Sequence, residues 1–108
     1  MKRKFLYIGN ENSSVLDASQ AVVDYANFYD TTLEKRLKEG DYDIVIYNLN
    51  GGGSFKNALE IMKNVKNLPR ILIGNIDDED SRRIRGYCDR IIINNKKELI
   101  QAIKELLG

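Results

Sequence analysis

The residues that could do chemistry in this sequence are concentrated at positions 48–54, which read Asn-Leu-Asn-Gly-Gly-Gly-Ser. They follow directly after the apolar run at positions 44–47. Such a run is typical of a strand buried in the middle of a parallel sheet, and ligands bind these sheets at the loops that follow the strands. The loop carries amides and glycines, and its strongest nucleophile is the hydroxyl of Ser54. The stretch therefore favours binding over acid–base or metal catalysis.

Composition removes several further classes of site. The chain has no histidine, so it lacks the commonest metal ligand and the usual general base of a Ser or Cys nucleophile. The single cysteine, Cys88, excludes an internal disulfide and is typical of a reducing cytoplasm. We interpret it as an inert, partly buried thiol rather than a redox sensor. We expect no metal, no cofactor and no enzymatic activity.

The charge and hydropathy of the sequence limit the classes of partner that we expect. The 17 basic and 16 acidic side chains give a net charge of +1, which offers no electrostatic argument for nucleic acid or an anionic membrane. No signal-peptide pattern and no apolar run of membrane-spanning length is present in the sequence. We therefore predict a cytoplasmic domain with no direct nucleic-acid contact and no membrane contact.

Five apolar segments alternate with helical patterns along the chain. We predict strands at residues 4–8, 24–29, 44–47, 70–73 and 90–93. We predict helices at about 13–22, from 33 to Gly40, from 55 to about 68, from about 77 to Gly86, and from Asn94 or Asn95 onward. Residues 21–28 also suit a strand, so the boundary between the first helix and the second strand stays open. This alternation predicts an α/β fold in a single domain, 1–108: a flavodoxin-like, doubly wound, five-stranded parallel sheet of order 2-1-3-4-5 with helices on both faces.

Three segments resemble the receiver domain of response regulators, and the resemblance extends along nearly the whole chain. GDYDIVIYN at 40–48 is similar to the receiver strand that leads to the phosphorylated aspartate. LPRILIGN at 68–75 is similar to the fourth strand, and GYCDRIIIN at 86–94 to the approach to the fifth strand. The resemblance implies a CheY-like fold and a role in two-component signal transduction and transcription regulation.

The positions that match the receiver's phosphorylation site have lost the required chemistry. A working receiver needs an acidic pair for Mg²⁺, an acceptor aspartate, a hydroxyl and a lysine, because phosphoryl transfer depends on positioning and charge neutralisation. The corresponding positions here are Gly9 and Asn10, Asn48, Gly74, and Ile93 or Asn94. The resemblance therefore implies a pseudo-receiver that is not phosphorylated in the usual way. A shifted alignment would offer Asp41 or Asp43 as acceptor, but at the wrong end of the strand.

Three features have two interpretations each. Asn48 is either an uncharged mimic of the unphosphorylated state or a polar residue that caps the loop. The loop residues Asn50, Gly51, Gly52, Gly53 and Ser54 either cradle an anion with backbone N–H groups or form a flexible turn, and their spacing matches neither the P-loop nor the dinucleotide motif. The arginines Arg82, Arg83, Arg85 and Arg90 either form an interface or lie on a solvated surface.

Together these observations predict a non-catalytic regulatory domain that acts through protein–protein contacts without aspartate phosphorylation. Its partner would be another protein, a downstream effector domain, or a second copy held through the predicted fourth helix, fifth strand and fifth helix. The alternative is a small domain that binds an anion or a nucleotide at the Gly/Asn-rich strand ends. The chain is compatible both with the N-terminal domain of a longer regulator and with a free-standing domain.

Overall fold

The computed structural model describes residues 3–9, 21–27, 30–51, 54–65, 67–93 and 96–108. Its strands are β1 (Arg3–Ile8), β2 (Ala21–Ala26), β3 (Ile44–Asn48), β4 (Arg70–Ile73) and β5 (Arg90–Ile92). Its helices are α1 (Leu33–Glu39), α2 (Phe55–Asn64), α3 (Asp78–Ile84) and α4 (Lys96–Leu107), and a short 3₁₀ turn, η1 (Leu49–Gly51), follows β3. The strands form one parallel sheet of order β2-β1-β3-β4-β5. The predicted flavodoxin-like, CheY-like fold is confirmed.

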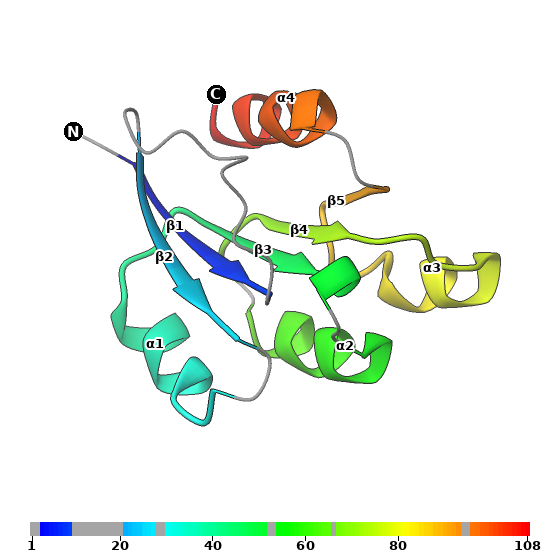
Figure 1. Cartoon of the computed structure of the whole chain (residues 1–108), viewed down its shortest axis with the longest axis horizontal. Coiled ribbons are helices and arrows are strands. Elements are labelled where there is room, and N and C mark those ends of the chain that lie inside the picture. Colours follow the sequence, from blue (N-terminus) through cyan, green and yellow to red (C-terminus); the bar gives the residue numbers. More distant parts are fainter. Residues whose placement is uncertain (1–2, 10–20, 28–29, 52–53, 66, 94–95) are drawn as a thin grey trace.

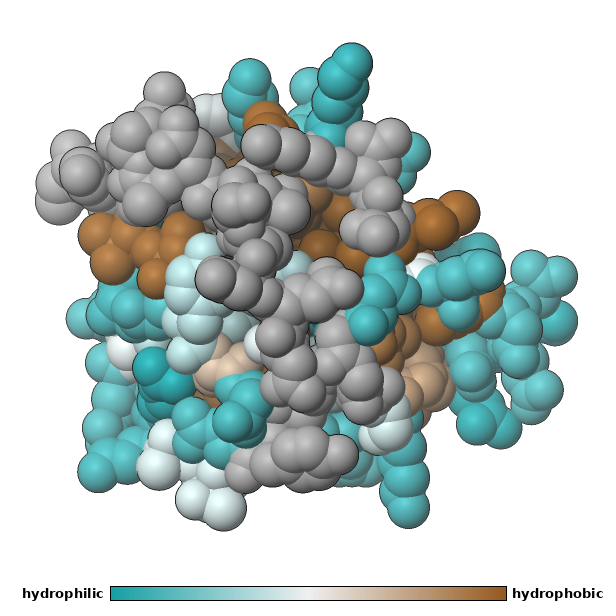
Figure 2. All heavy atoms as spheres, viewed as in Figure 1, coloured by the Kyte–Doolittle hydropathy of each residue, from teal (hydrophilic) through white to brown (hydrophobic). Residues whose placement is uncertain are grey.

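The sheet separates two apolar cores (Figure 1). On one face, α4 packs on the sheet, and on the other face α1, α2 and α3 supply the covering side chains. The central strand β3 serves both cores, because Ile44 and Ile46 face α4 whereas Val45 and Tyr47 face the other helices. All four side chains are fully buried, which explains why this run is apolar at every position. Figure 2 shows hydrophobic atoms in separate patches on one face, with hydrophilic atoms mostly at the margins.

Local capping fixes where the helices begin and end. The hydroxyl of Ser54 accepts a hydrogen bond from the N–H of Asn57 at the start of α2. The carboxylate of Asp77 accepts one from the N–H of Asp80 at the start of α3. Helix α1 ends at Gly40, where any side chain would clash with the ring of Tyr42. These three boundaries agree with the predicted ones, but α2 ends at Asn64 rather than near residue 68.

The second strand is the main correction. It was predicted to begin near residue 24 and to follow a helix that ended near 22, but Ala21 and Val22 already belong to β2. The pairing of Arg3 with Ala21 through Ile8 with Ala26 places these residues in the sheet. The rest of that predicted helix lies outside the described residues. The predicted helix caps Asn94 and Asn95 also lie outside them, and β5 ends at Ile92 rather than Ile93.

Candidate functional site

Four of the predicted site positions lie at the carboxyl ends of the strands. Gly9 follows β1, Asn48 ends β3, Gly74 follows β4 and Ile93 follows β5. A β-carbon placed on Gly9 would lie 3.1 Å from the Cβ of Asn48, so these two positions are in contact. The strands are parallel, and their carboxyl ends therefore form one edge, which we call the strand-end rim. Asn10 and Asn94 lie outside the described residues.

Asn48 occupies the acceptor position and is almost completely buried, with an exposed fraction of 1%. Its Nδ2 donates a hydrogen bond of 2.8 Å to the hydroxyl of Tyr7. Its Oδ1 accepts a hydrogen bond of 2.9 Å from the N–H of Asn50. Both ends of the amide are therefore engaged within the protein, as a buried polar group requires. An amide held in this way offers neither a nucleophile nor an anionic oxygen for Mg²⁺.

Gly74 occupies the position where a receiver carries a hydroxyl residue, and the side chain of Leu49 fills the space that a side chain at this position would need. A β-carbon placed on Gly74 would lie 2.8 Å from the Cβ of Leu49, which is closer than real side chains approach. The N–H of Gly74 continues the sheet ladder by donating to the carbonyl of Ile92 at 2.8 Å. A serine or threonine at position 74 therefore cannot be accommodated unless Leu49 moves.

The described part of the glycine-rich loop uses its polar side chains to hold the loop itself. The Nδ2 of Asn50 donates to the carbonyl of Ile93 at 3.1 Å and so ties the loop after β3 to the end of β5. The Ser54 hydroxyl caps α2, and Gly51 ends η1. Gly52 and Gly53 lie outside the described residues. The side chains of Asn50 and Ser54 thus already have partners within the chain, and the predicted anion contact by backbone N–H groups of this loop stays a prediction.

Tyr7 and Leu49 are the rim residues that sequence reasoning missed. Tyr7 pairs with Ile46 across β1 and β3, so its ring faces the same side of the sheet as Asn48, two residues further along. The alternation of faces was therefore the available signal for Tyr7. No comparable signal existed for Leu49, because its packing on Gly74 depends on the path of η1.

The predicted interface arginines are exposed on or beside α3 and β5, at the edge of the sheet that β5 forms. Arg82 and Arg83 lie in α3, Arg85 directly after it, and Arg90 begins β5. Arg83 lies 3.2 Å from the carboxylate of Glu79, and Arg90 lies 3.2 Å from that of Glu105. Exposed ion pairs of this kind contribute little to stability, so they do not prevent the arginines from contacting a partner.

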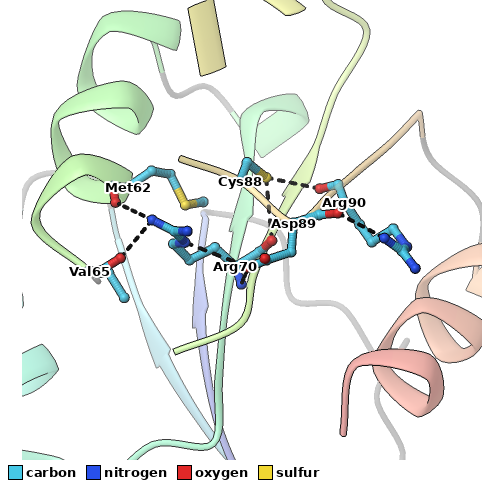
Figure 3. A network of polar contacts seen from close by, with 6 residues as sticks. All are labelled: Met62, Val65, Arg70, Cys88, Asp89 and Arg90. Carbon is cyan, nitrogen blue, oxygen red and sulfur yellow. Dashed lines mark hydrogen bonds and ion pairs between the residues drawn. The ribbon is translucent and has the colours of Figure 1, made fainter. Parts of the chain in front are cut away.

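A second polar network lies at the opposite, amino end of the sheet (Figure 3). Arg70, at the start of β4, donates to the carbonyls of Met62 and Val65 at the end of α2, at 3.2 and 2.8 Å. Its backbone N–H donates to the carboxylate of Asp89 at 2.8 Å. The thiol of Cys88 donates to the carbonyl of Arg90 at 3.0 Å. Burial raises the pKa of this thiol to about 11, which makes it unreactive at neutral pH.

A hollow of about 400 Å³ also lies at the amino end, where α1 and α2 both end. Its lining includes Leu37, Asp41, Tyr42, Val65 and Leu68, and no residue that the sequence predicted as a site. Within the described ranges, no three His, Cys, Asp or Glu side chains are grouped so that they could hold a metal ion. None of the helices in those ranges is long and apolar enough to span a membrane.

Comparisons with known proteins support the fold. No protein-family model matches the sequence, and no curated protein matches it. A response regulator from Thermotoga maritima is structurally similar, with a TM-score of 0.70 and 13% identity over 99% of this chain and 98% of that chain. NtrX from Brucella abortus, solved in complex with ATP, has a TM-score of 0.71 and 19% identity over 99% of this chain and 27% of that chain.

A third structure, a fusion that contains a trimeric coiled-coil segment of yeast Spc42, has a TM-score of 0.74 and 15% identity. It is matched over 99% of this chain and 78% of that chain. Identities this low establish the fold alone. The chain therefore has a receiver-like fold, and its function must be argued from its own residues.

Proposed function

We propose that this chain is a non-catalytic regulatory domain that acts through protein–protein contacts and is not switched by aspartate phosphorylation. The observation that carries the proposal is the state of Asn48. A buried neutral amide occupies the position of the acceptor, and both its ends are hydrogen-bonded to the protein. The neighbouring Gly9 and Gly74 supply neither a carboxylate nor a hydroxyl. Phosphoryl transfer needs both charge neutralisation and a nucleophile, and the described rim offers neither.

The contact surface that we propose is formed by α3, β5 and α4. It carries the four arginines together with Glu79 and Glu105, so charges of both signs are present. Such a surface suits either a protein partner or a second copy related by a two-fold axis. We further propose a cytoplasmic location, in keeping with the single cysteine. The described contacts of Asn50 and Ser54 favour a loop that is held by its own side chains over one that binds an anion.

The test is an amide NMR titration with Mg²⁺ and beryllofluoride, paired with mass spectrometry after incubation with acetyl phosphate. We expect no shifts at Gly9, Asn48 or Gly74 and no acid-labile phosphate. The matched variant is Asn48→Asp, which restores the acceptor but not the metal-binding pair. It should also remain unphosphorylated, since positions 9 and 10 still lack carboxylates.

Phosphorylation of the wild-type chain, or beryllofluoride shifts at the rim, would overturn the proposal. Phosphorylation of Asn48→Asp alone would show that the acceptor was the only missing group. A separate titration with inorganic phosphate and ATP addresses the alternative function. Shifts confined to residues 51–54 in that titration would favour anion binding over a purely protein-contacting role.

A further inference from the structure

The Asn-Gly pair at positions 50 and 51 is a chemical feature that the proposed function does not use. Of the asparagines in the sequence, only Asn50 is followed by a glycine. The backbone nitrogen of the next residue can attack an asparagine side-chain amide, and a glycine there obstructs the attack least because it has no Cβ. Asn50 is exposed and lies in η1, directly after β3 (Figure 1). The pair therefore combines a reactive sequence with access to water.

The other asparagines described near this loop are better protected. Asn48 is buried, both ends of its amide are hydrogen-bonded, and the side chain of Leu49 crowds the nitrogen that would attack it. Asn57 and Asn64 lie in α2, a helix of 10 residues that holds their backbone. Asn50, in contrast, lies in a turn of three residues that ends at the glycine itself.

Three features of the folded chain slow the reaction at Asn50. A 3₁₀ turn such as η1 has ψ angles of about −20 to −30°, whereas ring closure between the next nitrogen and the side chain needs ψ outside the helical range. The N–H of Asn50 donates to Oδ1 of Asn48 at 2.9 Å, and its Nδ2 donates to the carbonyl of Ile93 at 3.1 Å. One short turn and two hydrogen bonds can open without unfolding of the sheet.

We propose that Asn50 is a modification site, where the side-chain amide is hydrolysed without an enzyme when η1 opens in the folded protein. The backbone nitrogen of Gly51 loses its proton and attacks Cγ of Asn50. The new N–Cγ bond closes a cyclic imide, the Cγ–Nδ2 bond breaks, and ammonia leaves with the proton. Water then opens the imide at either of its carbonyl carbons, which gives aspartate or isoaspartate at position 50. No oxidant or reductant takes part.

The product no longer holds the loop to the end of β5. The oxygens of a carboxylate only accept hydrogen bonds, so neither can donate to the carbonyl of Ile93. The reaction also adds a negative charge beside Asn48, Gly74 and Ile93, which are neutral. Isoaspartate in addition lengthens the backbone by a methylene group. The change is irreversible, and the inference does not depend on the proposed contact surface.

Peptide mapping by mass spectrometry of the full wild-type chain, aged at physiological temperature, tests the site. Aspartate and isoaspartate should form at position 50 at least about tenfold faster than at Asn48, Asn57 or Asn64. Isoaspartate is the signature of the imide, because direct hydrolysis of the amide gives aspartate alone. The matched variant is Gly51→Ala, which should react about tenfold more slowly since its Cβ obstructs the attack.

A urea series tests whether the folded chain reacts. Below the unfolding transition, urea raises the unfolded population steeply but changes a local opening little. The rate at Asn50 should therefore stay within about twofold over this range. A rate that follows the unfolded fraction would overturn the proposal. So would aspartate without isoaspartate, an unreacted Asn50 in the folded chain, or a Gly51→Ala variant that reacts as fast as the wild type.

Amide hydrogen exchange of Asn50→Asp tests the consequence. We expect the protection of the N–H at position 50 to fall about tenfold, because η1 loses its bond to β5. The N–H of Lys4, which donates to Asp43 at the other end of the sheet, is the internal control and should keep its protection. Unchanged protection at position 50 would show that the modification does not release the loop.

Discussion

The two ends of the sheet carry polar groups of different kinds. At the carboxyl end, the strand-end rim is held by neutral groups: the amides of Asn48 and Asn50 bond to Tyr7 and to the carbonyl of Ile93. At the amino end, charged side chains provide the links. Arg70 holds the end of α2, and Asp89 holds the N–H of Arg70.

Two aspartates at the amino end of the sheet make the same pair of hydrogen bonds to the strand beside them. Asp43 stands directly before β3 and bonds to both the N–H and the carbonyl of Lys4 at 2.8 and 2.7 Å. Asp89 stands directly before β5 and bonds in the same way to Arg70, at 2.8 and 2.9 Å. In each case an aspartate joins the starts of two neighbouring strands. Asp43 is therefore not placed to be the phosphoryl acceptor, because it precedes β3 whereas Asn48 lies at the carboxyl end of that strand.

The comparison shows that the charged linking groups of the described residues lie at the amino end of the sheet and not at the carboxyl end. In parallel α/β sheets the carboxyl end is the usual place for charged, ligand-binding groups. Here the described rim is neutral and filled by packing, while the ionic groups join elements at the other end. The hydrogen bonds and packing described at the strand-end rim hold one arrangement of the strand ends, and this supports the proposal of a contact domain without a phosphorylation switch.

The largest expected effect is at Arg70. Replacing it with methionine removes the guanidinium that donates to the carbonyls of Met62 and Val65, in a site where the arginine side chain is only 15% exposed. The carbonyl of Met62 keeps its bond from the N–H of Val65 at 3.3 Å, whereas that of Val65 loses the guanidinium donor. We expect the free energy of unfolding, measured by urea denaturation, to fall by about 3 kcal/mol.

The matched control is Arg90→Met, which removes an ion pair whose two side chains are both about half exposed. It should cost less than about 1 kcal/mol. If the two variants lost equal stability, the buried network around Arg70 would be no more important than an exposed ion pair.

A smaller effect is expected at the rim. Asn48→Ala removes the partner of the Tyr7 hydroxyl and of the Asn50 N–H at a buried position, which should cost about 2 kcal/mol in the same assay. Asn50→Ala is the control, because this side chain is exposed and loses only its bond to Ile93. It should cost less than about 1 kcal/mol. A stable Asn48→Ala variant would mean that the rim is not held by this amide.

The sequence allowed most of the fold to be predicted, and the exception is instructive. The runs that became β3 and β4 are apolar on both faces and flanked by turn residues, so local pattern was sufficient. Residues 21–23 are compatible with both a helix and a strand, and only pairing with β1, distant in sequence, places them in the sheet. Local pattern cannot decide a segment whose conformation is selected by a remote partner.

The positions at the strand-end rim could be predicted, but the contacts that hold them could not. Parallel strand ends must meet at one edge, so the convergence of Gly9, Asn48 and Gly74 followed from the fold. Which groups satisfy Asn48 did not follow, because the Tyr7 bond depends on strand register and on the length of the ring. The closing of Gly74 by Leu49 depends on the geometry of η1, which a run of amides and glycines does not specify.

The smallest effect concerns Cys88 and appears only at high pH. Burial raises the pKa of its thiol from 9.0 to about 11. The unfolded chain therefore loses this proton first, and the free energy of unfolding should fall as the pH rises from about 9 to about 11. Relative to pH 7, the loss at pH 10 should be about 1 kcal/mol. Cys88→Ser lacks this titration, so the difference in unfolding free energy between it and the wild type should shrink by that amount between pH 7 and pH 10. A constant difference would mean that the thiol titrates normally and that this part of the amino end is open to water.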